Sequence, residues 1–162
     1  FAVLAWFSTA FAAVAPAPKR VLVYTVSAGY EHAVVQRARP DEPSLVERVL
    51  ERRARASGWF EVVLSRDAHD FSRESLARFD AVLFYTTGDL PLAPDEQRAL
   101  FDFVAAGHAF VGVHSATDTF PSVPAYGELV GAREQTACEL HAGGLRTLVQ
   151  VAFQLGVQVL ET

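Results

Sequence analysis

Side chains that can move protons or hold a ligand gather at a few points along an otherwise apolar chain. One group lies at residues 27–32 and ends in Glu-His, a second is the Thr-Gly-Asp run at residues 87–89, and a third spans residues 114–119 and begins with a histidine. Each group directly follows a short apolar run. Imidazole and carboxylate groups together serve as general acid and base or as metal ligands. The sequence therefore predicts one polar site, built from separate loops, that is suited to acid–base or metal chemistry.

The apolar runs themselves are predicted to be strands. They are rich in β-branched and aromatic residues and cover residues 19–26, 59–64, 79–86 and 109–114. Runs that are apolar throughout suit a sheet that is covered on both faces. Helices are predicted at residues 40–58, 70–78 and 94–106, with a further short helix within residues 121–131.

The first of these helices has clear end signals. Asp41 is expected to cap its N-terminus, Pro43 to lie in its first turn, and Gly58 to end it. Its apolar stripe is predicted to be Leu45, Val46, Val49 and Leu50. The arginines of this region alternate with acidic residues, which indicates a solvated helix face; they are Arg37, Arg39, Arg48, Arg52, Arg53 and Arg55.

The alternation of strands and helices predicts the fold class. It indicates an α/β protein, a three-layer sandwich with a parallel sheet and right-handed crossovers. Ligands of such sheets bind beyond the carboxyl ends of the strands, which here selects the loops at residues 27–32, 66–70, 87–89 and 114–119. We expect His32 and His114 to lie close together, because they follow the first and fourth strands, which can be neighbours in a sheet of this kind.

Four short motifs, in order along residues 19–132, resemble one family. They are Gly-Tyr-Glu-His at residues 29–32, Thr-Thr-Gly-Asp at 86–89, Phe-Val-Gly-Val-His-Ser-Ala-Thr-Asp at 110–118 and Tyr-Gly-Glu-Leu-Val-Gly at 126–131. This pattern resembles the ThuA-like family, named for trehalose utilisation, within the class I glutamine amidotransferase-like superfamily. The resemblance implies a flavodoxin-like sheet and a role in carbohydrate metabolism.

The resemblance also singles out His114. In the amidotransferase relatives, the turn after this strand carries a nucleophilic cysteine, and here the corresponding position is His114. Imidazole can act as general base, metal ligand or hydrogen-bond donor, but it cannot perform thiolate chemistry, so no glutamine amidotransferase activity is expected. Residues 112–116 do not fit the Gly-x-Ser-x-Gly pattern, which argues against a serine hydrolase.

The four motifs provide candidate site residues. The candidate catalytic residues are His114, His32, Asp118 and Glu31, with a carboxylate as the partner of a histidine. The candidate substrate-binding residues are Tyr30, Thr87, Gly88, Asp89, Ser115 and Tyr126. A divalent metal cofactor is an open alternative. So are plain structural roles, in which Asp118 caps a helix, residues 87–89 form only a turn and His114 bonds to backbone.

Two functions compete on this basis. The first is a hydrolase or lyase that acts on a sugar derivative, with His114 as general base or metal ligand. The second is a non-catalytic carbohydrate-binding module that holds a sugar through Tyr30, Tyr126, Asp89 and Asp118. In a third, plainer interpretation the chain is a fragment with no function of its own.

Composition excludes several other classes. A length of 162 residues suits one domain, and 51% hydrophobic residues with 20% charged residues are typical of a globular protein. The net charge of -5 argues against a nucleic-acid partner, which requires a basic face. Cys138 is the single cysteine, so a disulfide within the chain is excluded.

Both ends of the sequence carry separate predictions. Residues 1–15 are uncharged and apolar, end in small residues and precede two prolines, which is typical of a signal peptide. We therefore expect residues 1–17 to direct export to the periplasm or the outside of the cell, with cleavage after Ala12, and no membrane partner once they are removed. The domain would span residues 18–162, but its pattern departs from the family after residue 132, so an incomplete or altered end is expected there. Cys138 and His141 are three apart in this part and are not expected to form a catalytic pair.

Overall fold

The computed structural model describes residues 16–131 of the chain. The predicted signal peptide lies almost entirely outside these residues, and so do Cys138, His141 and the predicted change after residue 132. None of the helices in residues 16–131 is long and apolar enough to cross a membrane.

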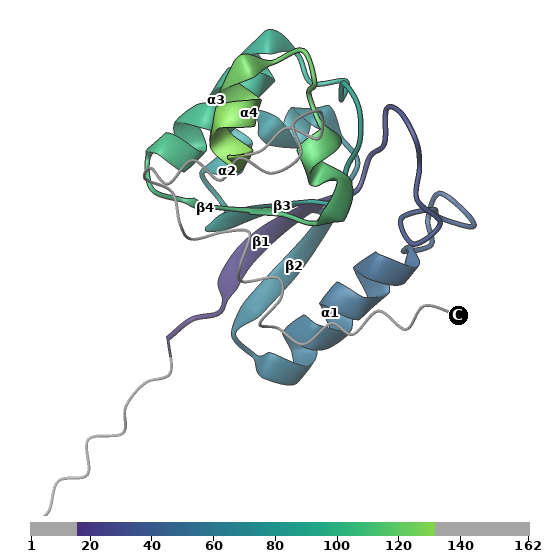
Figure 1. The fold of residues 1–162 in the computed structure, drawn as a ribbon. Helices are drawn as coiled ribbons and strands as arrows, with labels where there is room; N and C mark the ends of the chain where they lie inside the picture. The colour runs from purple at the N-terminus through teal and green to yellow at the C-terminus, as the bar shows by residue number, and fades with distance from the viewer. Residues whose placement is uncertain (1–15, 132–162) are drawn as a thin grey trace, which may run out of the picture.

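The centre of the described part is a parallel sheet of four strands (Figure 1). The strands are β1 (Lys19–Tyr24), β2 (Phe60–Ser65), β3 (Ala81–Phe84) and β4 (Ala109–Gly112). They lie in the order β2-β1-β3-β4. The predicted α/β fold with a parallel sheet is confirmed. The expectation that the first and fourth strands are neighbours is wrong, because β3 lies between them.

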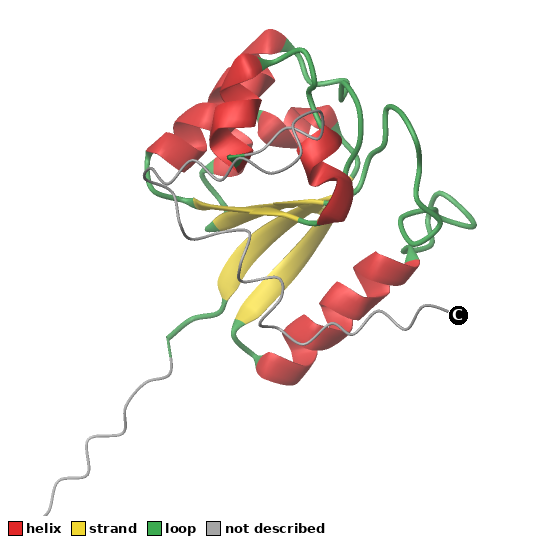
Figure 2. Ribbon diagram, viewed as in Figure 1, coloured by secondary structure: helices red, strands yellow, loops and turns green. Residues whose placement is uncertain are grey.

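Helices cover both faces of this sheet, as Figure 2 shows. The helix α1 (Leu45–Ser57) lies on one face, and α2 (Arg73–Leu76), α3 (Pro94–Ala105) and α4 (Pro124–Val130) lie on the other (Figure 1). Two short 3-10 helices, η1 (Ala68–Phe71) and η2 (His114–Asp118), follow the carboxyl ends of β2 and β4. The predicted helices are therefore present, with ends that differ by a few residues.

The main core lies between the sheet and α3. It is built on aromatic rings in edge-to-face and tilted contact, among them Tyr24, Phe71, Phe84, Phe110, Phe120 and Tyr126. These residues come from β1, β3 and β4 and from the segments that follow β2 and β4. Burial of so many large rings is the main favourable term that holds the sheet against this helical layer.

The start of α1 differs from the prediction. Ser44, not Asp41, caps the helix, and Glu47 completes a capping box by accepting a hydrogen bond from the Ser44 backbone N–H. The predicted apolar stripe is also wrong in part: Leu45 is 51% exposed, whereas the charged Glu47 is fully buried. The helix is turned so that Glu47 faces inward, where Arg37 and Thr25 meet its carboxylate. Gly58 ends the helix in a left-handed conformation, as predicted.

Candidate functional site

Backbone hydrogen bonds tie together the three segments that follow β1, β3 and β4. The Ala28 N–H donates to the Thr87 carbonyl over 2.8 Å, and the Gly88 N–H donates to the Asp118 carbonyl over 2.9 Å. The Phe120 N–H in turn donates to the Gly88 carbonyl over 3.0 Å. The loop after β3 is thus the centre of the assembly, with the other two loops attached on either side.

Four rings gather on this assembly. The imidazoles of His32 and His114 contact each other edge to face, with 4.6 Å between ring centroids. Tyr85 stacks on His114 at 5.7 Å and lies 6.0 Å from His32. Tyr30 packs edge to face against His32 at 4.9 Å and is 72% exposed. The predicted proximity of the two histidines is therefore present, but it arises across β3 because the long segment after β1 reaches over the end of that strand.

His114 adopts a backbone conformation that is uncommon for a residue with a side chain. Its φ is 50°, directly after β4, and Phe120 has a φ of 49° at the other end of η2. Left-handed conformations cost an ordinary residue roughly 1–2 kcal/mol. Such strain is most often found where a side chain must be presented in one particular direction. Here it presents an exposed imidazole at the carboxyl edge of the sheet.

Tyr85 is a site residue that the sequence analysis missed. It follows β3 directly, and its backbone N–H still donates to the Tyr24 carbonyl as a continuation of the sheet. Because the apolar run of residues 79–86 was predicted to be strand throughout, Tyr85 was counted as part of the buried sheet. Partial burial raises the pKa of the Tyr85 hydroxyl. The signal that could have revealed Tyr85 is its position at the carboxyl end of a strand next to the Thr-Thr-Gly-Asp motif.

Thr87 is buried within the assembly, and the half-buried Gly88 makes close backbone contacts there. The Thr87 hydroxyl donates to the Tyr30 carbonyl over 2.7 Å and fixes the loop that carries His32. Gly88 has a φ of 71°, and a Cβ at this position would lie 2.8 Å from the Ala28 carbonyl carbon. Only glycine fits such a close approach. In this arrangement both residues hold the loops that carry the rings.

Among the described residues, the predicted carboxylates form no ion pair or side-chain hydrogen bond with His32 or His114. Glu31 forms an ion pair with Arg66, with 3.6 Å between the charged atoms. Asp118 contributes its backbone carbonyl to Gly88. The side chains of Asp89 and Asp118 are exposed at the rim of the loops.

Tyr126 does not lie where the prediction required. Tyr126 is 1% exposed, stacks on Phe84 and donates its hydroxyl to the Ala116 carbonyl over 2.7 Å. The prediction that Tyr126 contacts a substrate is therefore wrong. Its ring packs in the aromatic core, and its hydroxyl is hydrogen-bonded to η2. The Ser115 and Ser27 hydroxyl oxygens are buried and have no partner among the described residues.

A metal site is not assembled by the described part of the chain. Within residues 16–131, no group of three or more histidine, cysteine, aspartate or glutamate side chains converges to hold a metal ion. His32 and His114 alone would supply two nitrogen ligands, which is fewer than metal sites usually take from a protein.

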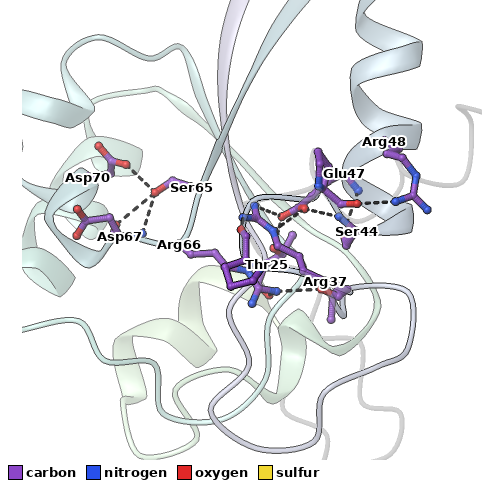
Figure 3. Close-up of polar contacts among 12 residues, drawn as sticks. Thr25, Arg37, Ser44, Glu47, Arg48, Ser65, Arg66, Asp67 and Asp70 are labelled. Carbon is purple, nitrogen blue, oxygen red and sulfur yellow. Dashed lines mark hydrogen bonds and ion pairs between the residues drawn. The ribbon is translucent and has the colours of Figure 1, made fainter.

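A buried carboxylate holds the segment between β1 and α1, which carries Tyr30 and His32 (Figure 3). The Glu47 carboxylate accepts two hydrogen bonds from Arg37, at 2.9 and 2.8 Å, and one from the Thr25 hydroxyl at 2.6 Å. Burial alone would raise the pKa of Glu47, but these bonds and the one from the Ser44 N–H outweigh it and lower the pKa. Arg37 is only 17% exposed, so the prediction of a solvated arginine is wrong for this residue.

A parallel α/β sheet with its polar side chains at the carboxyl edge defines the class of protein. Folds of this class bind their ligands at that edge. The particular family is given by a family model described as "ThuA: Trehalose utilisation", which matches residues 20–158. The chain belongs to this family, as the motifs in the sequence predicted.

The fold also has a relative among solved structures. A ThuA-like protein from Bacteroides uniformis superposes with a TM-score of 0.51 at 19% sequence identity. The match covers 78% of this chain and 48% of that one, so the chain spans about half the length of that protein. At this identity the likeness supports the fold. No curated protein matches the chain.

Proposed function

We propose that this ThuA domain acts on a sugar derivative as a hydrolase or lyase, with His32 and His114 as its acid–base pair. The observation that carries the proposal is the contact of the two imidazoles, 4.6 Å apart between ring centroids, at the carboxyl edge of the sheet. Glutamine amidotransferase activity is not part of the proposal, because His114 takes the place of a thiolate.

The pair is suited to moving protons in both directions. A neutral imidazole can accept a proton and a protonated one can donate a proton, so two imidazoles in contact can supply both a base and an acid. The neutral ring would accept the proton of a water or of the substrate. The protonated ring would donate a proton to the oxygen that leaves as its bond to carbon breaks. One proton enters the pair and one departs, so the pair returns to its starting charge.

The surroundings of the pair favour a neutral, hydroxyl-rich substrate. Tyr30 offers an exposed aromatic face beside His32, and Tyr85 offers a second ring beside His114. Aromatic faces suit the C–H groups of sugars, because a ring carries partial negative charge on its face. The exposed carboxylates of Asp89 and Asp118 at the rim can accept hydrogen bonds from sugar hydroxyls.

Replacement of the histidines tests this proposal. We expect His114→Asn and His32→Asn each to lower turnover by roughly 10²–10⁴-fold, which is the usual contribution of general acid–base catalysis. Asparagine is chosen for His114 because it tolerates a left-handed backbone. The matched control is His69→Asn, since the His69 side chain is 91% exposed and distant in sequence from the pair.

The measurement is hydrolysis or elimination by the whole chain with trehalose, other disaccharides and nitrophenyl glycosides. Turnover in the His69→Asn variant that equals that of the unaltered protein, with loss in the other two, supports the pair. Turnover that survives His114→Asn contradicts it.

The high exposure of Tyr30 favours a second candidate, a carbohydrate-binding module without catalysis. Calorimetric titration of the same sugars separates the two. Sugar binding that is weakened by Tyr30→Ala and retained in His114→Asn, with no turnover in either protein, would favour binding alone.

We also propose that the protein is exported, on the basis of the uncharged, apolar residues 1–15. Mass spectrometry of the mature protein from its natural gene tests this. A first residue of Ala13 is expected; a mature protein that retains residues 1–12 contradicts export by this segment.

A further inference from the structure

The segment that carries Tyr30 and His32 has little regular structure of its own. It runs from the end of β1 to the start of α1, residues 25–44, and contains neither a helix nor a strand, only an isolated bridge at Ser27. Its position over the end of β3 therefore depends on contacts made by its ends and its middle.

One buried carboxylate meets the segment at three places. Glu47 receives the Thr25 hydroxyl where the segment begins, the Arg37 guanidinium in its second half and the Ser44 N–H where it ends. The side chain of Glu47 is fully buried, and Figure 3 shows these groups converging on it. Both of its oxygens are used, because Oε1 accepts from Thr25 and Arg37, and Oε2 accepts from Arg37 and Ser44.

A second arginine holds the same segment from the side of β2. Arg66 donates to the Thr25 carbonyl over 3.2 Å and to the Val35 carbonyl over 2.9 Å, and it pairs with Glu31 next to His32. A backbone bond from the Val46 N–H to the Val34 carbonyl joins the segment to α1. The chain on both sides of His32 is thus held by Arg66 and by the start of α1, neither of which contacts the two histidine rings.

We propose that Glu47 is a positioning residue that acts through Arg37 and Thr25 to hold His32 against His114. Its importance for turnover rests on the proposed function, but its effect on the ring contact does not. A buried ion pair is weak as a source of stability, since desolvation offsets most of its attraction. The ion pair of Glu47 and Arg37 does restrict the segment to one arrangement, because any other arrangement of the segment would leave the buried carboxylate without hydrogen-bond partners.

The test uses the ring contact itself. In the unaltered full chain we expect a nuclear Overhauser effect between the ring protons of His32 and His114. In Glu47→Gln this signal is expected to be lost while the amide spectrum of the β-strands is unchanged. The matched control is Glu51→Gln on the same helix, whose partner Arg55 is exposed and pairs over 3.7 Å.

Every outcome decides the proposal. A ring contact that is retained in a folded Glu47→Gln protein overturns the proposal, as does its loss in Glu51→Gln. If Glu47→Gln does not fold, Thr25→Val removes one bond only and must still weaken the ring contact. Failure of the proposed function has a different signature: the ring contact responds to Glu47→Gln as expected, yet His114→Asn leaves turnover unchanged.

Discussion

At the scale of single residues, His114 combines a strained backbone with an exposed ring. Its φ of 50° is one that glycine adopts freely and histidine adopts only at a cost. The backbone conformation alone would favour a glycine at this position. The presence of an imidazole there indicates that the ring is retained for what it contacts, which is His32 and Tyr85.

This conflict between stability and function can be measured. We expect His114→Gly to change the free energy of unfolding by less than about 1 kcal/mol, because relief of left-handed strain of roughly 1–2 kcal/mol offsets the lost ring contacts and the greater entropy of glycine in the unfolded chain. Turnover should be lost in the same variant. Urea unfolding is the measurement, and Val113→Gly, at an ordinary extended position, is the control that should destabilise. A His114→Gly variant that is destabilised as much as Val113→Gly would argue that the strain is absent.

Tyr85 gives a second prediction at this scale. Its ring contacts both histidines, so Tyr85→Leu should cost about 1 kcal/mol of stability, within the range of aromatic pairs, and should lower turnover. Tyr85→Phe keeps the ring and serves as the comparison in thermal unfolding and turnover assays. Equal loss in the two variants would assign the effect to the hydroxyl instead of the ring.

At the scale of elements, the loop after β3 is where the site is joined together. It bonds to the segment after β1 through Thr87 and to the segment after β4 through Gly88. The buried hydroxyls of Thr86 and Thr119 form a further hydrogen bond of 2.6 Å between the loop after β3 and the segment after β4. The ring cluster therefore depends on a loop whose own side chains are mostly hidden from the surface.

Gly88 is the most sensitive position of this junction. Gly88→Ala should destabilise the protein by more than about 2 kcal/mol, because left-handed strain adds to a clash with backbone that cannot move easily. Gly107→Ala is the matched control: its φ of 97° carries strain, but nothing lies within 4 Å of its added Cβ. Chemical denaturation of both variants is the measurement. A Gly88→Ala protein no less stable than Gly107→Ala would contradict the close approach.

At the scale of the whole molecule, the two layers of helices are held to the sheet by different means. The layer with α3 is held by aromatic packing, whereas α1 meets the sheet next to a buried ion pair. Breaking such a pair from one side is costly, because it leaves the other charge buried. Stability of the whole chain should therefore depend on the charge of Glu47.

The dependence on pH follows from the lowered pKa of Glu47. Its ordinary value is 4.5 and the folded value lies below it, so the folded state keeps the charge while the unfolded state takes up a proton. The stabilisation is complete above pH 4.5 and is lost as the pH falls through the folded pKa. We expect Glu47→Gln to cost about 3 kcal/mol at pH 7 and progressively less below pH 4.5. Urea unfolding at several pH values is the measurement, and a cost that does not change with pH contradicts it.

Much of this protein was determined by local sequence. Apolar runs predicted each strand, and helix signals such as Gly58 predicted where α1 ends. The motifs predicted the family and the loops of the site. Local patterns succeed here because strand and helix formation depend on neighbouring residues, and because parallel strands bring their carboxyl ends to one edge whatever their order.

Only the tertiary structure decided which side chains meet. The strand order put β3 between the two histidine-bearing loops, so Tyr85 joined the ring cluster and the histidines met across it. Packing also buried Tyr126 in the core and Glu47 on the inward face of α1, although both side chains carry polar groups. These outcomes depend on partners far apart in the sequence, such as Thr25 for Glu47, and a buried polar group is stable only where such partners converge.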